Sequence, residues 1–265
     1  MTGALKLTRR TAYTLVELAE PATKNALSDR MKLELKSTIE ELSQDAALRA
    51  VVLTGSGGAF CAGGDIKAML HRHMNNEKNT ADDVAERMAE LHGWLRKLRD
   101  LPVPVIVAVD GPAYGAGFGL ALTGDLIIAS DRATFSASFG KIGAVPDANL
   151  MWSLPRVTGL QRARELFYTG RVVDATQALE MGIVMEVHSP DALVPRAIEM
   201  AGMMSNVSPL AYGLVKEITA RSMEQDSDTL LRREAEAQAL CLTSPYHFDA
   251  IERFAARQKP KFDFD

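Results

Sequence analysis

One stretch of the chain decides the fold: the run Val105-Ile106-Val107-Ala108-Val109, which leads through Asp110-Gly111-Pro112-Ala113-Tyr114 into Gly115-Ala116-Gly117-Phe118-Gly119. The run is wholly apolar and mostly β-branched, which is typical of a strand that is covered on both faces. The residues after it are small and lead into a helix that we expect over about 116–124. A buried strand, a glycine-rich turn and a helix in this order indicate an α/β core.

A second glycine-rich turn, Ala59-Phe60-Cys61-Ala62-Gly63-Gly64-Asp65-Ile66, follows a short strand that we expect at 50–53. Small residues let a ligand approach the backbone closely, and the first N–H groups of a helix have no intrahelical partner. Two such N–H groups aimed at one point would form an oxyanion hole, where the helix dipole also favours negative charge. The two turns therefore predict an enzyme that stabilises an enolate.

The rest of the chain predicts an α/β core followed by helices only. Further strands are expected at 12–18, 126–129, 134–136 and 183–187, and helices after Ser28 and at 82–98, 149–157, 160–168, 208–223, 226–242 and 245–258. Residues 66–80 are polar and rich in His and Asn, so we expect a mobile segment there. We place the core in residues 1–200 and a helical region in residues 201–265.

Composition excludes several classes of protein. The chain has 265 residues, of which 47% are hydrophobic, and its net charge of −4 argues against general binding of nucleic acid. Two cysteines, Cys61 and Cys241, fit a reducing compartment. Met1 to Arg10 has no apolar stretch of signal-peptide type, and no run approaches membrane-spanning length. We therefore expect a cytoplasmic protein with no membrane or nucleic-acid partner, and His71 and His73 alone do not indicate a metal site.

Several motifs in order resemble the enoyl-CoA hydratase/isomerase family, also called the crotonase family. They are 21–27, 60–66, the glycine turn followed by 125–129, 143–147, 154–157, 175–184 and 254–258. The resemblance implies a crotonase-like spiral of ββα units with a C-terminal helical trimerisation region, which would form a homotrimer or a dimer of trimers. It also implies an acyl-CoA substrate, with coenzyme A as part of that substrate and no permanently bound cofactor.

The resemblance also implies the residues of the site. The peptide N–H groups of Ala62 and Ala116 match the two oxyanion donors of the family. The residues expected to contact the acyl-CoA are Lys24, Ala26, Ala62, Gly63, Gly64, Asp65, Ile66, Gly115, Ala116, Phe139, Phe254 and Arg257.

The carboxylates indicate which reaction to expect. Hydratases of this family use two glutamates, and this chain has Gly119 and Phe139 at the matching positions, neither of which can carry a proton. Asp147 resembles the catalytic carboxylate of the enoyl-CoA isomerase and epoxyphenylacetyl-CoA isomerase branches. One carboxylate is enough for a 1,3-proton shift, and desolvation would raise its pKa. We therefore favour an isomerase with Asp147 as base; the other interpretation is that Asp147 only caps the helix at 149–157.

Three alternatives stay open at this point. The chain could be a hydratase despite the missing glutamates. It could resemble the 4-chlorobenzoyl-CoA dehalogenases, in which an Asp at the Asp147 position attacks an aromatic carbon and a His at about the place of His92 activates water, although that branch has Trp where this chain has Phe139. It could also be a catalytically silent CoA-binding subunit.

Overall fold

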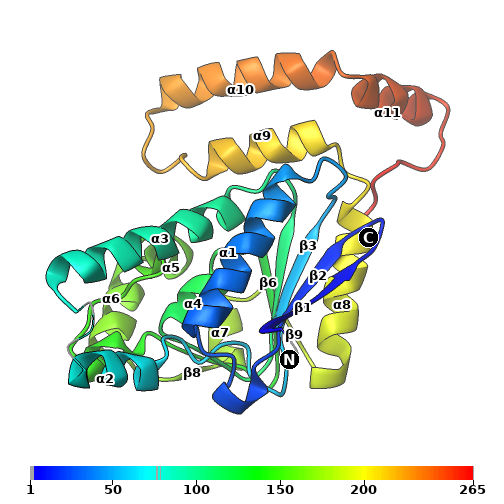
Figure 1. Ribbon diagram of the computed structural model, residues 1–265. Coiled ribbons are helices and arrows are strands. Elements are labelled where there is room, and N and C mark those ends of the chain that lie inside the picture. Colours follow the sequence, from blue (N-terminus) through cyan, green and yellow to red (C-terminus); the bar gives the residue numbers. More distant parts are fainter. Residues whose placement is uncertain (1–2, 76, 78, 265) are drawn as a thin grey trace.

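A six-stranded sheet forms the centre of the fold in the computed structural model, which describes residues 3–75, 77 and 79–264 (Figure 1). Its strands, in spatial order, are β1 (Leu5–Arg9), β2 (Thr14–Leu18), β3 (Val51–Gly55), β4 (Val105–Val109), β6 (Leu126–Ser130) and β9 (Glu186–His188). β1 pairs antiparallel with β2, and the other neighbours are parallel. Every residue of β4 is buried, as its apolar sequence predicts.

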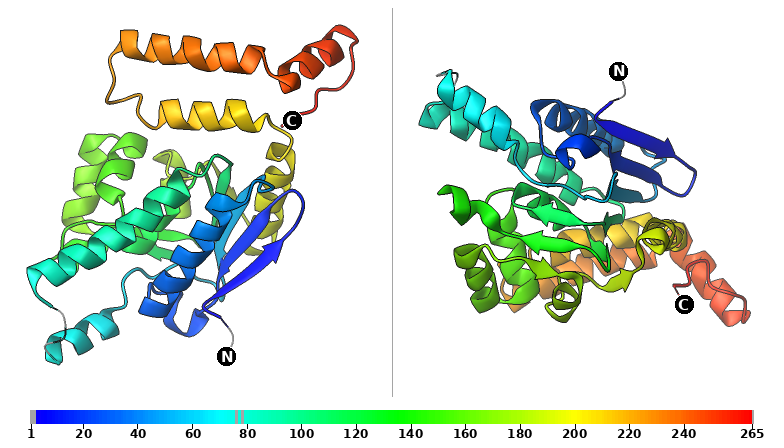
Figure 2. Two further views of the ribbon diagram at one scale, coloured as in Figure 1. Left: turned by 45° about the horizontal axis from the view of Figure 1, so that its top comes forward. Right: turned by 90° about the horizontal axis from the view of Figure 1, so that it is seen from below.

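Successive side chains of β4 point to opposite faces of the sheet, and helices cover both faces. Ile106 and Ala108 pack against α8 (Pro190–Met204) on one face. Val105, Val107 and Val109 belong to the larger core on the other face. That core also contains residues of α1 (Asp29–Gln44), α3 (Ala81–Arg99) and α4 (Ala116–Ala121). Figure 2 shows these layers from two further sides.

The core also contains a second, three-stranded sheet. It contains β5 (Pro112–Tyr114), β7 (Thr134–Ser136) and β8 (Val173–Asp174). β4, β5 and α4 follow each other directly in the chain, and β6 and β7 are followed, after a 3-10 helix, by α5 (Leu150–Thr158). The strand of the large sheet, the short strand and the helix form one repeating ββα unit. The remaining elements of the core are η1 (Pro21–Thr23), α2 (Ile66–Met74), η2 (Ser138–Ile142), α6 (Leu160–Thr169) and α7 (Ala175–Glu180).

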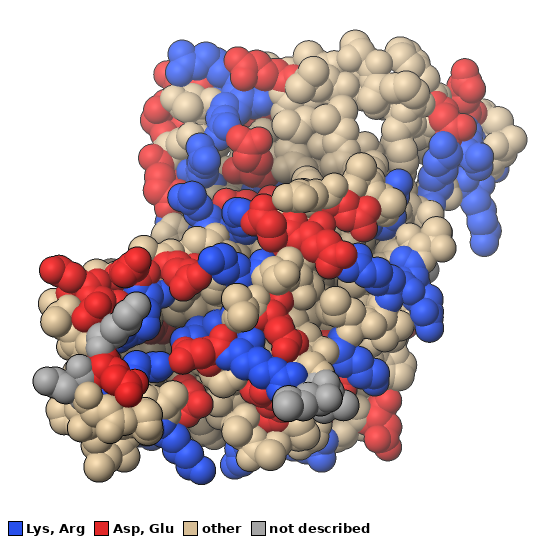
Figure 3. Space-filling model, in the orientation of Figure 1, with Lys and Arg blue, Asp and Glu red and all other residues tan. Residues whose placement is uncertain are grey.

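The last three helices extend beyond this core. α9 (Pro209–Thr219) lies beside the core, and α10 (Ser227–Leu242) packs on α9 before α11 (Pro245–Ala255). No residue of these three helices is buried. Figure 3 shows that charged side chains of both signs are interspersed over the core, whereas uncharged side chains gather over part of the C-terminal helices.

The secondary structure differs from the predictions at three places. No strand was expected before residue 12, but β1 lies there and pairs with β2. The segment 66–80 was expected to be mobile, but residues 66–74 form α2, because the Asp65 carboxylate caps it by accepting a hydrogen bond of 3.0 Å from the Ala68 N–H. Residues 76 and 78 lie outside the described part of the chain. The last strand begins at Glu186 rather than at residue 183.

Every helix within residues 3–75, 77 and 79–264 is too short or too polar to cross a lipid bilayer.

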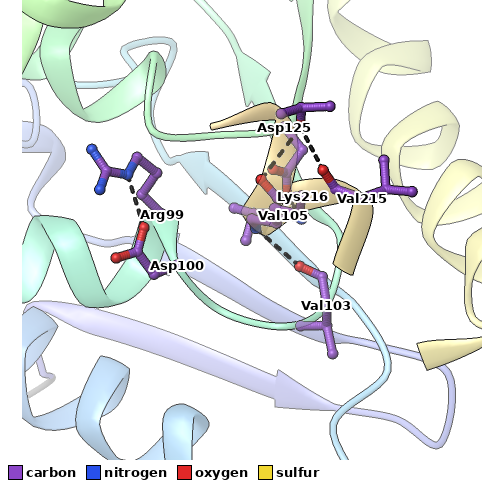
Figure 4. A network of polar contacts seen from close by, with 8 residues as sticks. Arg99, Asp100, Val103, Val105, Asp125, Val215 and Lys216 are labelled. Carbon is purple, nitrogen blue, oxygen red and sulfur yellow. Dashed lines mark hydrogen bonds and ion pairs between the residues drawn. The ribbon is translucent and has the colours of Figure 1, made fainter. Parts of the chain in front are cut away.

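A network of polar contacts joins α9 to the core (Figure 4). The Lys216 ammonium contacts the Asp125 carboxylate at 2.7 Å, and the same carboxylate oxygen accepts a hydrogen bond of 2.8 Å from the Val105 N–H. The Lys216 side chain is 11% exposed and the Asp125 side chain 20%. The pair therefore fixes the first helix of the C-terminal region to the start of β4.

We predict that Lys216→Met lowers the free energy of unfolding by about 3 kcal/mol, because it leaves the Asp125 carboxylate largely buried without its cation. Lys36→Met is the matched control, since Lys36 pairs with Glu90 at the exposed surface and its loss should change stability by less than about 1 kcal/mol. Denaturant titration of both variants measures the difference. Equal losses would contradict a structural role for the pair.

Candidate active site

The two glycine-rich turns lie in direct contact through their backbones. The Cys61 N–H donates a hydrogen bond of 3.0 Å to the Pro112 carbonyl, and the Tyr114 N–H donates one of 2.9 Å to the Cys61 carbonyl. A Cβ atom on Gly63 would lie 2.5 Å from the Tyr114 carbonyl oxygen, and one on Gly117 would lie 2.3 Å from the Cys61 carbonyl oxygen. Only glycine permits this approach, so these two glycines bring the turns together.

The structure corrects one of the two predicted oxyanion donors. The Ala62 N–H donates a hydrogen bond of 2.9 Å to the Lys24 carbonyl, so it is not free to bind a ligand. Lys24 and Asn25 adopt left-handed backbone conformations, with φ of 52° and 55°. This bend brings the Lys24 carbonyl toward the second turn. The prediction that Ala62 supplies the first donor is therefore wrong.

The neighbouring amides remain available. Within the described residues, neither the Gly64 N–H nor the Ala116 N–H has a hydrogen-bond acceptor. A Cβ atom on Gly63 would lie 3.4 Å from the Ala116 nitrogen, so the peptide that ends in the Gly64 amide lies beside the start of α4. Ala116 is the first residue of α4, where the N–H has no partner within the helix. Gly64 and Ala116 thus present two unpaired donors side by side.

Asp147 lies in the loop before α5, and its carboxylate is half-buried. Its Oδ1 atom is buried and has no hydrogen-bond partner among the described residues. Burial raises the pKa of the Asp147 carboxyl above its ordinary value, and the nearby charge of His92 only partly offsets this effect. A buried carboxylate oxygen without a donor is costly, which makes it a candidate for a functional group.

The interpretation that Asp147 only caps α5 is wrong. The N-cap residue is Asn149, and no side chain caps the helix. Asp147 contributes only its backbone carbonyl, which accepts a hydrogen bond of 2.9 Å from the Leu150 N–H. The carboxylate is therefore not used by the helix.

Helix α4 also determines where Asp147 lies. A Cβ atom on Gly119 would lie 2.4 Å from the Ala148 carbonyl oxygen and 2.6 Å from the Ala148 Cβ. Ala148 is fully buried and, like Asn149, has a positive φ. Ala116, the first residue of α4, thus presents an amide. Gly119, three residues later in the same helix, packs against Ala148, the residue that follows Asp147. This contact packs the loop that carries Asp147 against the helix whose first residue presents the Ala116 amide.

Phe139 forms an apolar wall beside the glycine-rich turn that leads into α4. Its side chain is buried, and its Cζ atom would lie 3.7 Å from a Cβ atom on Gly115. Neither Gly119 nor Phe139 has a side chain that can carry a proton.

His92 lies on α3 and faces the same region. It is exposed, and its charge acts on the Asp147 carboxyl. His92 also lines a cavity of about 220 Å³ together with Leu95, Arg96, Arg99 and Asn149. Sequence reasoning placed His92 near the site but did not identify Arg96 or Arg99, although both follow it on α3 at helical spacing.

Two residues of the turn at 59–66 have structural roles. The Asp65 carboxylate is used as the cap of α2, and Cys61 is fully buried. Burial raises the pKa of the Cys61 thiol to about 12, so it is protonated at neutral pH and is not a nucleophile.

The predicted CoA contacts are spread over the molecule. Lys24 is exposed at the end of η1, Ala26 is buried, and Ile66 is exposed at the start of α2. Phe254 is 85% exposed on α11, and Arg257 follows that helix. Within one chain, α11 lies apart from α2 and α4, the helices that begin at the two turns (Figure 1).

The chain is similar to known proteins along its whole length. A family profile described as Enoyl-CoA hydratase/isomerase matches residues 8–264. A 1,2-epoxyphenylacetyl-CoA isomerase of Escherichia coli K12 is 33% identical over 92% of each chain. A short-chain-enoyl-CoA hydratase of Clostridium acetobutylicum is 32% identical, also over 92% of each chain. A 4-chlorobenzoyl coenzyme A dehalogenase of an Arthrobacter species is 28% identical over 92% of this chain and 87% of the dehalogenase.

The fold agrees with these relatives. A crystal structure of an enoyl-CoA hydratase/isomerase from Cupriavidus metallidurans CH34 superposes with a TM-score of 0.91 at 35% identity, covering 98% of this chain and 96% of that one. The predicted crotonase-like spiral is thereby confirmed.

We predict that Gly119→Ala destabilises the protein by about 1–3 kcal/mol, because the added methyl group overlaps Ala148 and must displace the Asp147 loop. Gly93→Ala is the control, since Gly93 lies in α3 with no atom within 4 Å of its added Cβ and the change should favour the helix by about 1 kcal/mol. Thermal unfolding measures both variants. An unchanged or raised stability of Gly119→Ala would refute the tight contact.

Proposed function

The chain belongs to the enoyl-CoA hydratase/isomerase family, and from this premise we propose that it isomerises an acyl-CoA thioester, by a double-bond shift or a ring rearrangement. The observation that carries the proposal is the Asp147 carboxylate, which is half-buried and lacks a hydrogen bond at Oδ1 among the described residues. Positions 119 and 139 hold Gly and Phe, so neither supplies a second carboxylate. One such group suits a reaction in which a proton leaves one carbon and returns to another.

The amides of Gly64 and Ala116 would hold the thioester oxygen in this reaction. As negative charge moves onto that oxygen, two fixed N–H donors stabilise the enolate, and each such donor is worth roughly 3–4 kcal/mol in comparable sites. Asp147 would take the proton from the carbon next to the carbonyl or conjugated with it. The raised pKa of this carboxyl brings it closer to neutral pH, which makes it a better base and acid.

Hydration is less compatible with these residues. A hydratase must hold water and move its protons with groups at the Gly119 and Phe139 positions. The space beyond Gly119 is filled by Ala148, and Phe139 is an apolar side chain. The site therefore lacks both the proton carriers and the room for a side chain at position 119.

A dehalogenase-like hydrolysis is the second candidate. It is supported by the nearness of His92 to Asp147, since a nucleophilic Asp and a water-activating His form the pair that this chemistry needs. Halide release from a halobenzoyl-CoA would decide for this candidate.

The proposal also covers how the chain binds coenzyme A and how copies of the chain assemble. Lys24, Phe254 and Arg257 would contact the CoA part of the substrate, with α11 supplied by a neighbouring copy in a homotrimer. The exposed apolar side chains of the C-terminal helices support self-association, because monomeric proteins rarely expose large apolar patches. They include Val215, Leu231, Leu240, Leu242, Phe248 and Ile251.

We predict that purified protein converts 3-enoyl-CoA into the conjugated 2-enoyl-CoA and that Asp147→Asn slows this at least 100-fold, the lower range for loss of an acid–base group. Absorbance of the conjugated thioester measures the rate. The same variant should keep or gain thermal stability, because it removes a partly buried charge. Hydroxyacyl product formed from 2-enoyl-CoA, or CoA binding without turnover of any thioester, would overturn the proposal.

We also predict the direction of the pH dependence. The base must be ionised, so kcat/KM should fall as the pH decreases through the raised pKa of Asp147, at a pH above the value of about 3.9 for an ordinary Asp. Because the folded-state pKa is raised, the ionised group also lowers stability, and this loss develops as the pH rises through the folded-state pKa. A pH–rate profile and a pH series of thermal unfolding test both signs. A profile that is flat down to pH 4 would contradict Asp147 as base.

A further inference from the structure

We infer that the cavity beside Asp147 receives the far end of an acyl group that carries a carboxylate. This inference rests on the proposed function, because it requires the thioester to lie at the amides of Gly64 and Ala116.

The cavity lies next to the proposed base. Asn149, which forms part of its wall, follows Asp147 by two residues, and His92 lines the cavity while its charge acts on the Asp147 carboxyl. The volume of about 220 Å³ is below the usual size of a whole ligand site. It corresponds to about seven water molecules at roughly 30 Å³ each, which suits one end of an acyl chain rather than the CoA.

Positive charge dominates the wall of this cavity. His92, Arg96 and Arg99 follow each other at spacings of four and three residues, so they share one face of α3. Leu95 and Asn149 complete the lining, which contains no acidic side chain among the described residues. Two acidic residues adjoin the lining in sequence: Asp147, the proposed base, which precedes Asn149 by two residues, and Asp100, which follows Arg99.

The two arginines differ in what they already bind. Arg99 contacts Asp100 through its Nε atom at 2.9 Å (Figure 4). Its guanidinium lies 5.0 Å from the centre of the Trp152 ring. The Arg96 side chain has no ion pair or hydrogen bond within the described residues. Of the two arginines, Arg96 therefore keeps its guanidinium without a partner among the described residues, and Arg99 is paired with Asp100 beside it.

A guanidinium matches a carboxylate in shape and charge, because two parallel N–H groups can bind its two oxygens. An alkyl end of the same length would displace water from Arg96 and Arg99 without replacing those hydrogen bonds. The cavity thus favours an acyl group with a terminal carboxylate and disfavours its uncharged counterpart.

The test compares matched thioesters: the mono-CoA ester of an unbranched enedioic acid and the enoyl-CoA of equal chain length, at several lengths. Wild-type kcat/KM should be at least tenfold higher for the carboxylate-bearing substrate at the best length. Arg96→Gln should remove this preference, and Arg164→Gln, an exposed arginine on α6 that loses the same charge, should keep it. Calorimetry with the two saturated thioesters should give the same order of affinity without turnover.

The outcomes separate the two proposals. If the wild type isomerises both substrates with equal kcat/KM, or if Arg96→Gln leaves a preference unchanged, the inference about the cavity is overturned and the isomerase proposal stands. If the wild type isomerises neither substrate at any length, the proposed function itself fails.

Discussion

Backbone contact between the two glycine turns is the constraint on which the rest of the site depends. A Cβ atom on Gly63 or on Gly117 would lie within 2.5 Å of a carbonyl oxygen of the other turn. No other residue therefore fits at either position without moving the chain. Their approach sets the Gly64 peptide beside the first residue of α4. Two unpaired amide donors therefore come from segments that lie about fifty residues apart in the sequence.

The same short helix links the amides to the carboxylate. α4 offers the Ala116 N–H at its start and contacts Ala148 through Gly119 one turn later. Glycine at position 119 thus has two consequences: the position carries no proton carrier, and it leaves room for the loop that carries Asp147.

Much of this could be predicted from the sequence, and the failures have physical causes. The β-branched run of β4 and the glycines of the turns are local signals, so strand, turn and helix were predicted correctly. The donor was placed at Ala62 because nothing nearby in the sequence reveals that its N–H is bound by Lys24, nearly forty residues earlier. Buried Asn25, which donates to the carbonyls of Ser56 and Ala59, fixes that contact. The available signal was Asn25 itself, a polar residue between Lys24 and the apolar pair Ala26-Leu27, which indicates a buried hydrogen-bonding side chain at this bend.

Arg96 and Arg99 were missed because their common face on α3 matters only once Asn149 and Trp152, which are distant in sequence, lie beside it.

The most direct test of the central claim observes the amides themselves. In ¹⁵N-labelled Asp147→Asn protein, binding of a saturated acyl-CoA should shift the amide protons of Gly64 and Ala116 strongly downfield. The Ala62 amide should change little and exchange slowly with solvent before and after binding. A large shift at Ala62 with none at Gly64, or no selective shift at either turn, would contradict the account.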